Sequence, residues 1–249
     1  MGCRLLILWL VLFMPGVLSF PAQAASDKVL RVAVLENSPP MAFREANGEL
    51  SGFSVAMIRA VCEEIQAVCN FQVTTLEKVL DEVASGEVDV AAVSLLDTPE
   101  RRGRLLFSKP YFRSISLWFA KPGVRPGQPG VRVATVRGSA QERFAHGRNW
   151  ETVGVRTNGE LAEPLVAGVA QAAIIPMSTG WNLMKKPEVQ QLGLVTTVMN
   201  EPELGGEASF GISPHRPLLK EQIDAALDRI KRNGTYDRIN SLFLPFRVN

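Results

Sequence analysis

Short apolar runs and amphipathic segments alternate along this chain, and this alternation restricts the fold more than any other feature. Apolar runs of strand length recur at 30–35, 88–94, 131–136 and 172–175. Segment 53–65 carries apolar residues at helical spacing, with Ser54 as its expected N-cap. Because strands and helices alternate, we expect an α/β fold with largely parallel sheets that helices cover on both faces.

Two such series are separated by turn-forming segments. A hairpin is expected around Asn47-Gly48 in the first series, together with a strand at 71–75 and a helix at 76–84. A proline- and glycine-rich stretch follows the strand expected at 115–120, and a second interruption falls at 200–206. Further strands are expected at 152–155, 192–198 and 208–212, and further helices at 139–144, 158–167, 178–184 and 217–232. We therefore expect two lobes, between which the chain crosses near 115–120 and 204–212.

The first 24 residues have the pattern of a secretory signal peptide. Arg4 precedes an apolar stretch at 5–18, and Ala22-Gln23-Ala24 offers a small-x-small cleavage site. The apolar stretch is too short and too interrupted to form a membrane-spanning helix. We therefore expect residues 1–24 to be removed and the product to be exported. In the mature chain, we expect residues 25–116 and 207–249 to form one lobe and residues 117–206 to form the other.

Charge and motif content exclude several classes of function. The formal net charge is +2 and falls to +1 when Arg4 leaves with the signal, so nothing predicts binding to nucleic acid. The two histidines, His146 and His215, are expected at the surface. The sequence has no nucleophile elbow, zinc-type spacing or glycine-rich phosphate loop. We therefore expect neither a metal, nor an organic cofactor, nor an enzymatic activity.

Two cysteines, Cys62 and Cys69, remain after processing. In one uninterrupted helix their side chains would lie about 10 Å apart, too far for a bond. If the helix ends near Ala67, the chain can fold back and bring Cys69 beside Cys62. Export favours this disulfide, and a pair of buried free thiols is the alternative.

The segment Thr98-Pro99-Glu100-Arg101 predicts a short helix directly after an apolar strand. Thr98 is a good N-cap and Pro99 suits the first helical position. The helix start would direct backbone N–H groups at a ligand, and Arg101 would add a guanidinium suited to a carboxylate. The carboxyl ends of strands are where α/β sheets place ligands. On the tetrapeptide alone, an arginine on a solvated helical turn is the alternative.

A set of short motifs follows in a fixed order across nearly the whole mature chain. They are Leu30-Arg-Val-Ala-Val, Ser38-Pro-Pro-Met-Ala-Phe, Gly48-Glu-Leu-Ser-Gly-Phe-Ser-Val, Gly86-Glu-Val-Asp-Val, Thr98-Pro-Glu-Arg, Phe107-Ser-Lys-Pro-Tyr-Phe, Val136-Arg-Gly-Ser-Ala-Gln-Glu, Phe210-Gly-Ile and Asn233-Gly-Thr-Tyr-Asp-Arg-Ile. In this order they resemble bacterial periplasmic solute-binding proteins of the polar-amino-acid ABC-transporter family, family 3.

The resemblance implies a type II periplasmic-binding-protein fold, whose two lobes are joined by two crossing segments. Such a protein closes on a small solute in the periplasm and delivers it to an inner-membrane ABC permease, and we expect it to be a monomer. The spacing of Cys62 and Cys69 also resembles the disulfide of some members that bind basic amino acids.

The resemblance also assigns part of a ligand-binding site. The carboxylate-binding arginine corresponds to Arg101, on the helix that starts at Thr98. A second anion-binding helix start corresponds to Ser139, which forms an S-x-x-E capping box with Glu142, and capping alone is the alternative role for Ser139. Ser94 falls where the family offers backbone groups to the ligand.

Other positions depart from the family pattern. The acid that holds the α-ammonium of the ligand corresponds to Pro176, a hydroxyl residue to Leu96, and a stacking aromatic to Ser38. A first-lobe acid corresponds to Leu35, or to Glu36 after a one-residue slip. Because a buried ammonium without a carboxylate is costly, we expect a carboxylate ligand that lacks the amine, or an amine held by Glu36 alone.

The function expected first is solute binding for an ABC import system, with closure on a small carboxylate or amino-acid-like ligand. A degenerate binding protein that serves a periplasmic partner, such as a dehydrogenase or a sensor, is the second hypothesis. Leu96 and Pro176 support this hypothesis, because apolar residues at these positions can fill the ligand-binding cleft. A dehydratase-like enzyme comes last, because it needs a positioned acid or base, and Glu36 is the one carboxylate suspected of that role.

Overall fold

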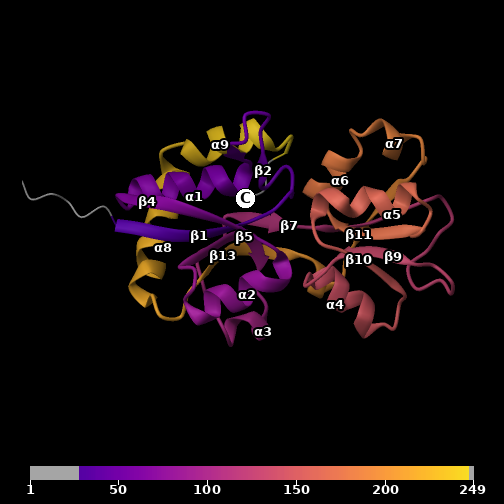
Figure 1. The fold of residues 1–249 in the computed structure, drawn as a ribbon, viewed down its shortest axis with the longest axis horizontal. Coiled ribbons are helices and arrows are strands. Elements are labelled where there is room, and N and C mark those ends of the chain that lie inside the picture. The colour runs from indigo at the N-terminus through magenta and orange to yellow at the C-terminus, as the bar shows by residue number, and fades with distance from the viewer. Residues whose placement is uncertain (1–27, 247–249) are drawn as a thin grey trace, which may run out of the picture.

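A computed structural model describes residues 28–246, which form two groups of strands and helices (Figure 1). Each group has its own main β-sheet. The first group holds the beginning and the end of the described chain, and the second group holds the middle. The signal peptide expected at 1–24 lies outside the described residues. Within residues 28–246, no helix has both the length and the apolar character needed to cross a membrane.

The sheet of the first group has the strand order β4–β1–β5–β13–β6, and β7 also pairs with β13. Its strands are β1 (Lys28–Leu35), β4 (Ala67–Thr74), β5 (Val90–Leu96), β6 (Leu106–Phe107), β7 (Phe112–Ser114) and β13 (Gly206–Ile212). Strand β1 runs parallel to β4 and β5, whereas β13 runs antiparallel to β5, β6 and β7. The sheet is therefore mixed rather than largely parallel, because β13 brings the chain back from the second group in the opposite direction.

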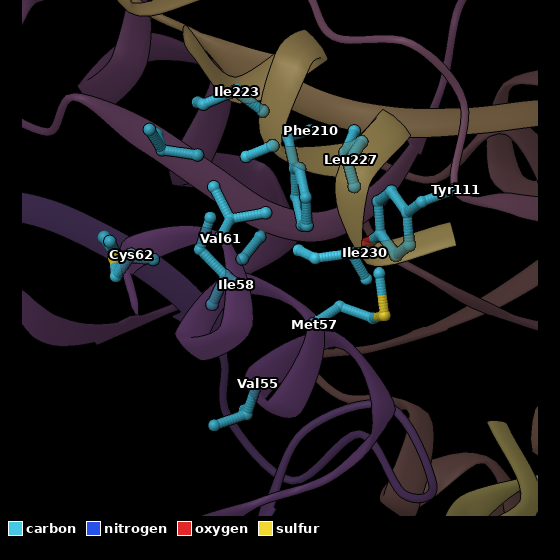
Figure 2. Packing of buried hydrophobic residues seen from close by; sticks show 14 of the residues in the cluster. Val55, Met57, Ile58, Val61, Cys62, Tyr111, Phe210, Ile223, Leu227 and Ile230 are labelled. Carbon is cyan, nitrogen blue, oxygen red and sulfur yellow. The ribbon is translucent and has the colours of Figure 1, made fainter. Parts of the chain in front are cut away.

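Side chains of β1 alternate between two helical layers. Leu30, Val32 and Val34 pack in one cluster with α1 (Phe53–Glu64), α8 (Pro217–Arg232) and α9 (Thr235–Phe243). Ala33 and Leu35 pack on the other face with α2 (Leu76–Ser85). Figure 2 shows the first layer, where side chains of α1 and α8 gather around Phe210 of β13. Each fully buried aliphatic side chain here contributes roughly 1.5–3 kcal/mol, so this layer anchors the first group.

The first group also contains a short hairpin and a short helix. The hairpin predicted around Asn47-Gly48 is present as β2 (Phe43–Arg44) and β3 (Leu50–Ser51), and Gly48 has the positive φ of 84° that the turn requires. The short helix α3 (Pro99–Arg102) follows β5.

The sheet of the second group has the order β10–β9–β11–β8–β12. Its strands are β8 (Ser116–Ala120), β9 (Val133–Val136), β10 (Thr152–Val155), β11 (Ala172–Pro176) and β12 (Val195–Met199). Its helical elements are α4 (Ala140–Gly147), η1 (Asn158–Leu161), α5 (Ala162–Val166), α6 (Met177–Leu183), α7 (Pro187–Gln190) and η2 (Pro202–Leu204). Strand β9 is parallel to β10 and β11, and β8 is antiparallel to β11 and β12. The lobe boundaries at 116/117 and 206/207 stay a prediction.

Some predicted elements differ in detail from the structure. Helix α1 starts after Gly52, and Ser54, predicted as its cap, is instead a buried residue of the first turn. Gly52 has a φ of 120°, and a Cβ there would lie 2.4 Å from the Met41 carbonyl oxygen, so only glycine fits this entry to the helix. The segment 158–167 divides into η1 and α5, and α7 occupies residues just before the strand predicted at 192–198.

Cys62 and Cys69 form a disulfide with their Cα atoms 6.0 Å apart, as the sequence favoured. Helix α1 ends at Glu64, and Gln66 adopts a φ of 52°. The chain then enters β4 at Ala67. This early helix end brings the two sulfur atoms together, because the chain folds back within a few residues.

The buried carboxylate of Asp89 joins distant segments of the first group. It accepts hydrogen bonds from the backbone N–H and guanidinium of Arg31, at 2.9 and 2.8 Å, and from Arg216 at 3.0 Å. Burial alone would raise the pKa of Asp89, but these hydrogen bonds outweigh it and hold the pKa below its usual value. The stabilisation is therefore complete above the unfolded-state pKa of about 3.9, and it is lost as the pH falls through the lower folded-state pKa.

Replacing Asp89 by asparagine should lower the free energy of unfolding at pH 7 by about 2–3 kcal/mol, because two half-exposed guanidinium groups lose their buried partner. The difference from the wild type should shrink as the pH falls below about 4. Urea denaturation across this pH range measures both effects. Asp228→Asn is the control, since it removes an exposed partner of Lys109 and should change little. Equal losses for the two variants would contradict the role given to Asp89.

Candidate functional site

A cavity of about 90 Å³ lies where the two groups meet. Both groups contribute to its walls. The first group provides the β1–β2 connection, α1, the end of β5, α3 and β7, and the second group provides the start of α4, η1 and the β11–α6 junction. Its polar lining residues are Ser38, Ser54, Ser94, Arg101, Ser114, Ser139, Gln141, Asn158, Ser178 and Thr179. Apolar lining residues include Leu35, Met41, Leu76, Leu96, Ile174 and Pro176. None of the described residues that line the cavity is acidic, and Arg101 is the one basic residue among them.

Arg101 is held in place by the start of α3. The helix begins as predicted, since the Thr98 hydroxyl accepts a hydrogen bond from the Arg101 N–H at 3.4 Å and Pro99 occupies the first turn. The Arg101 side chain is 4% exposed. Its Nη1 donates to the Leu96 carbonyl oxygen at 3.1 Å, whereas its Nε has no hydrogen-bond partner among the described residues.

The charge of Arg101 is not balanced within the cavity. Burial and the nearby positive charge of Arg143 outweigh the nearby Glu100 carboxylate and lower the pKa of the Arg101 guanidinium to about 10, so the group is still charged at neutral pH. No ion pair with Arg101 is present between residues 28 and 246, and Arg143 itself lies 3.6 Å from Glu100. A buried cation without a counter-ion costs several kcal/mol, and an anionic ligand would offset that cost.

The start of α4 adds hydrogen-bond donors to the same cavity. The Ser139 hydroxyl accepts the Glu142 N–H at 3.0 Å, as the capping box predicts. The Glu142 carboxylate accepts the N–H of Gly138, at 2.8 Å, rather than that of Ser139. The N–H groups of Ala140 and Gln141 have no partner in the described part of the chain, and both residues line the cavity. Capping therefore leaves two donors free at this helix start.

Ser94 belongs to a buried hydroxyl cluster that the sequence did not reveal. Its N–H donates to the Tyr111 hydroxyl at 3.1 Å, its Oγ lies 2.9 Å from the same oxygen, and Ser54 Oγ lies 3.0 Å from Ser94 Oγ. Burial raises the pKa of Tyr111, which stays neutral and stacks on Phe210. The backbone N–H of Ser94 is thus engaged within the protein, while the side chain of Ser94 lines the cavity.

Hydrogen bonds join the two groups beside the cavity. The Gly159 N–H donates to the Asn37 carbonyl oxygen at 2.9 Å, and Asn158 Nδ2 donates to Ser38 Oγ at 3.1 Å. Asn158 also accepts from Thr179 at 3.4 Å, so it connects both walls. The structure therefore represents a closed arrangement of the two groups. Sequence reasoning missed Asn158, because nothing local marks a residue at the start of a short 3₁₀ helix as a bridge.

The residues proposed from the sequence fall in different places. Ser38, Ser94, Leu96, Arg101, Ser139 and Pro176 all line the cavity. Glu36 does not line it; its side chain is about half exposed and forms an ion pair with Arg156 at 3.0 Å. Thr98 caps α3 and lines a neighbouring open hollow of about 850 Å³ between α3, α4 and η2. Among the described residues no cluster of His, Cys, Asp and Glu side chains could hold a metal ion.

These features define a two-part protein that encloses a small, electropositive cavity between its parts. Residues 30–245 match the family of bacterial extracellular solute-binding proteins, family 3. Because this match spans most of the sequence, the chain belongs to that family. The chain is also similar to the L-arginine-binding protein of Pseudomonas aeruginosa, with 25% identity over 247 residues that cover 94% of each chain.

Solved structures confirm the type II periplasmic-binding-protein fold. An ancestral arginine-binding protein bound to arginine matches with a TM-score of 0.76 and 23% identity, covering 86% of this chain and 97% of that one. An ancestral amino acid-binding protein, AncCDT-1, described as a precursor of cyclohexadienyl dehydratase, matches with a TM-score of 0.75 and 22% identity. It covers 87% of this chain and 95% of its own. At this level of identity the structural likeness concerns the fold alone.

Replacing Arg101 by methionine should raise the stability of the ligand-free protein by about 1–3 kcal/mol. The substitution removes a buried charge whose pKa is lowered by burial, and it leaves only the Leu96 carbonyl oxygen without a partner. Thermal unfolding of protein refolded without ligand measures the change. Arg102→Met removes an exposed arginine paired with Asp97 and should give no such gain. A loss of stability in Arg101→Met would show that Arg101 is compensated within the protein.

Proposed function

We propose that this protein is the periplasmic solute-binding component of an ABC import system and closes on a small carboxylate or amino-acid-like ligand. The observation that carries the proposal is Arg101, a buried guanidinium that lines an enclosed cavity and has no ion-pair partner in the described chain. The carboxylate of the ligand would bind Arg101, with Ser139, Ser94, Ser38, Leu96 and Pro176 forming the surrounding walls. Thr98 would position Arg101 through its cap.

Closure of the two groups is the proposed mechanism. The ligand would bind the first group at Arg101 and then draw the α4 start of the second group over it. Contacts such as Gly159 with Asn37 form only when the groups meet, so they would hold the closed state that a permease recognises. The connections between β7 and β8 and between β12 and β13 would serve as hinges. The protein would act as a monomer in the periplasm, after loss of residues 1–24.

A binding role without catalysis is the better fit to this cavity. General acid–base chemistry needs a titratable side chain beside the substrate, and the described lining residues include no His, Asp, Glu, Lys or Cys. The family relative reported above is likewise named for binding. Glu36, the carboxylate suspected from the sequence, is paired with Arg156 outside the cavity lining.

Thermal unfolding with a panel of amino acids, hydroxy acids, keto acids and dicarboxylates tests the proposal. A ligand at about 100 times its dissociation constant should add about 2.7 kcal/mol, a rise of roughly 5–10 °C for a chain of this size. Arg101→Met should abolish the rise, and Arg102→Met should retain it. If no compound raises the melting temperature of folded, ligand-free protein, solute binding is contradicted and a role with a protein partner becomes the better hypothesis.

Replacing Gly138 by alanine should weaken ligand affinity by roughly 10- to 100-fold. Gly138 has a φ of 73°, and a Cβ there would lie 3.0 Å from the Cα of Glu77 in the opposite group, so the closed state would be overpacked. Gly130→Ala is a matched control, because Gly130 has a φ of 74° with nothing within 4 Å of the added Cβ. Titration calorimetry with the ligand from the panel measures both. Equal affinities for the two variants would mean that binding does not require this closure.

A further inference from the structure

We propose that the ligand is a short monocarboxylate without an ammonium group, of the α-hydroxy or α-oxo acid class. This inference rests on the function proposed above, because it names the class of solute that the same cavity takes. It separates this chain from the amino-acid-binding proteins to which it is similar.

The charges around the cavity favour one negative charge on the ligand. Arg101 is buried and has no ion-pair partner among residues 28–246. Arg143 lies nearby, and its guanidinium is 3.6 Å from the Glu100 carboxylate. A monocarboxylate would balance Arg101. A zwitterionic amino acid would leave one uncompensated positive charge in the closed cavity, and arginine or lysine would leave two. The free N–H groups of Ala140 and Gln141 add further donors suited to an anion.

No group in the described lining offers an ammonium the carboxylate it needs. Pro176 ends β11 and lines the cavity, and its lining neighbours Ile174, Ser178 and Thr179 are neutral. The side chain of Glu36 is 51% exposed, bound to Arg156 and absent from the lining. Neutral oxygens can accept hydrogen bonds from an ammonium, but they do not offset its charge in a buried site.

The neutral polar groups suit a hydroxyl or a keto oxygen. Ser114 and Ser178 line the cavity, and neither hydroxyl has a hydrogen-bond partner in residues 28–246. A serine hydroxyl can donate to a keto oxygen and can both donate to and accept from a hydroxyl. The cavity of about 90 Å³ is small and enclosed between the two groups, which suits a short-chain acid.

Isosteric pairs of compounds test the inference directly. Titration calorimetry would compare lactate and pyruvate with alanine, glycerate with serine, and α-hydroxyisovalerate with valine, with arginine included separately. Within the pair that fits best, the hydroxy or oxo acid should bind at least about tenfold more tightly than the amino acid, because only the ammonium differs in charge. Arginine should not bind measurably.

Pro176→Asp supplies the missing carboxylate and should reverse the preference. The substitution should shift the ratio of amino-acid to hydroxy-acid affinity by at least about tenfold toward the amino acid. Pro176→Asn is the matched control, since it removes the same proline and adds a side chain of the same shape without charge. The asparagine variant should keep the preference of the wild type.

The possible outcomes separate this inference from the proposed function. Preference for the hydroxy or oxo acid, reversed by Pro176→Asp and kept by Pro176→Asn, supports both. Amino acids that bind the wild type as tightly as their hydroxy counterparts overturn the ligand class and leave solute binding intact. If none of these compounds binds but another member of the wider panel raises the melting temperature, the ligand class is overturned and solute binding stays intact. Absence of a hit in both experiments overturns the proposed function itself. Binding that Arg101→Met leaves unchanged overturns the charge argument.

Discussion

The buried guanidinium of Arg101 is the constraint around which the functional part of this molecule is organised. A charged side chain that is 4% exposed, with no ion-pair partner between residues 28 and 246, opposes folding at neutral pH. The rest of the first group must therefore be stable enough to tolerate it. The two-sided packing on β1, the Cys62–Cys69 disulfide and the Asp89 pairing with Arg31 and Arg216 provide that stability away from the cavity. Stability and ligand binding are thus separated in space.

The second group contributes the wall that completes the cavity. Its α4 start adds uncapped N–H groups, and Asn158 joins Ser38 of the first group to Thr179 of its own. Leu76 of the first group also packs against the hydrophobic cluster of the second group, so the two groups meet through both polar and apolar contacts. Arg101 and the α4 donors lie on opposite sides of the gap, and an anion between them would be attracted by both.

Local signals predicted much of the fold. Thr98 and Pro99 start α3, Ser139 caps α4, and Asn47-Gly48 turns the β2–β3 hairpin, because each of these depends on neighbouring residues only. The predictions were wrong where contacts with distant segments determine the local structure. Ser54 was expected as a cap, but its hydroxyl is buried against Ser94 and Tyr111, and the first sheet is mixed because β13 returns from the second group. The hydroxyl cluster and the Asn158 bridge join residues 17 to 120 positions apart, and no short window contains them.

By itself the sequence determined the alternation of strands and helices, the two thiols that pair, the arginine at the start of α3 and the neutral residue at position 176. These properties follow from residue type and short-range spacing. Only the tertiary structure decided that Arg101 has no ion-pair partner among residues 28–246 and that Glu36 pairs with Arg156 outside the cavity lining. It also decided that the Ser94 N–H donates a hydrogen bond to the Tyr111 hydroxyl. The reason is physical: the balance of charge in a cavity depends on every group that packs around it, and the chain brings those groups together only when both halves have folded and met.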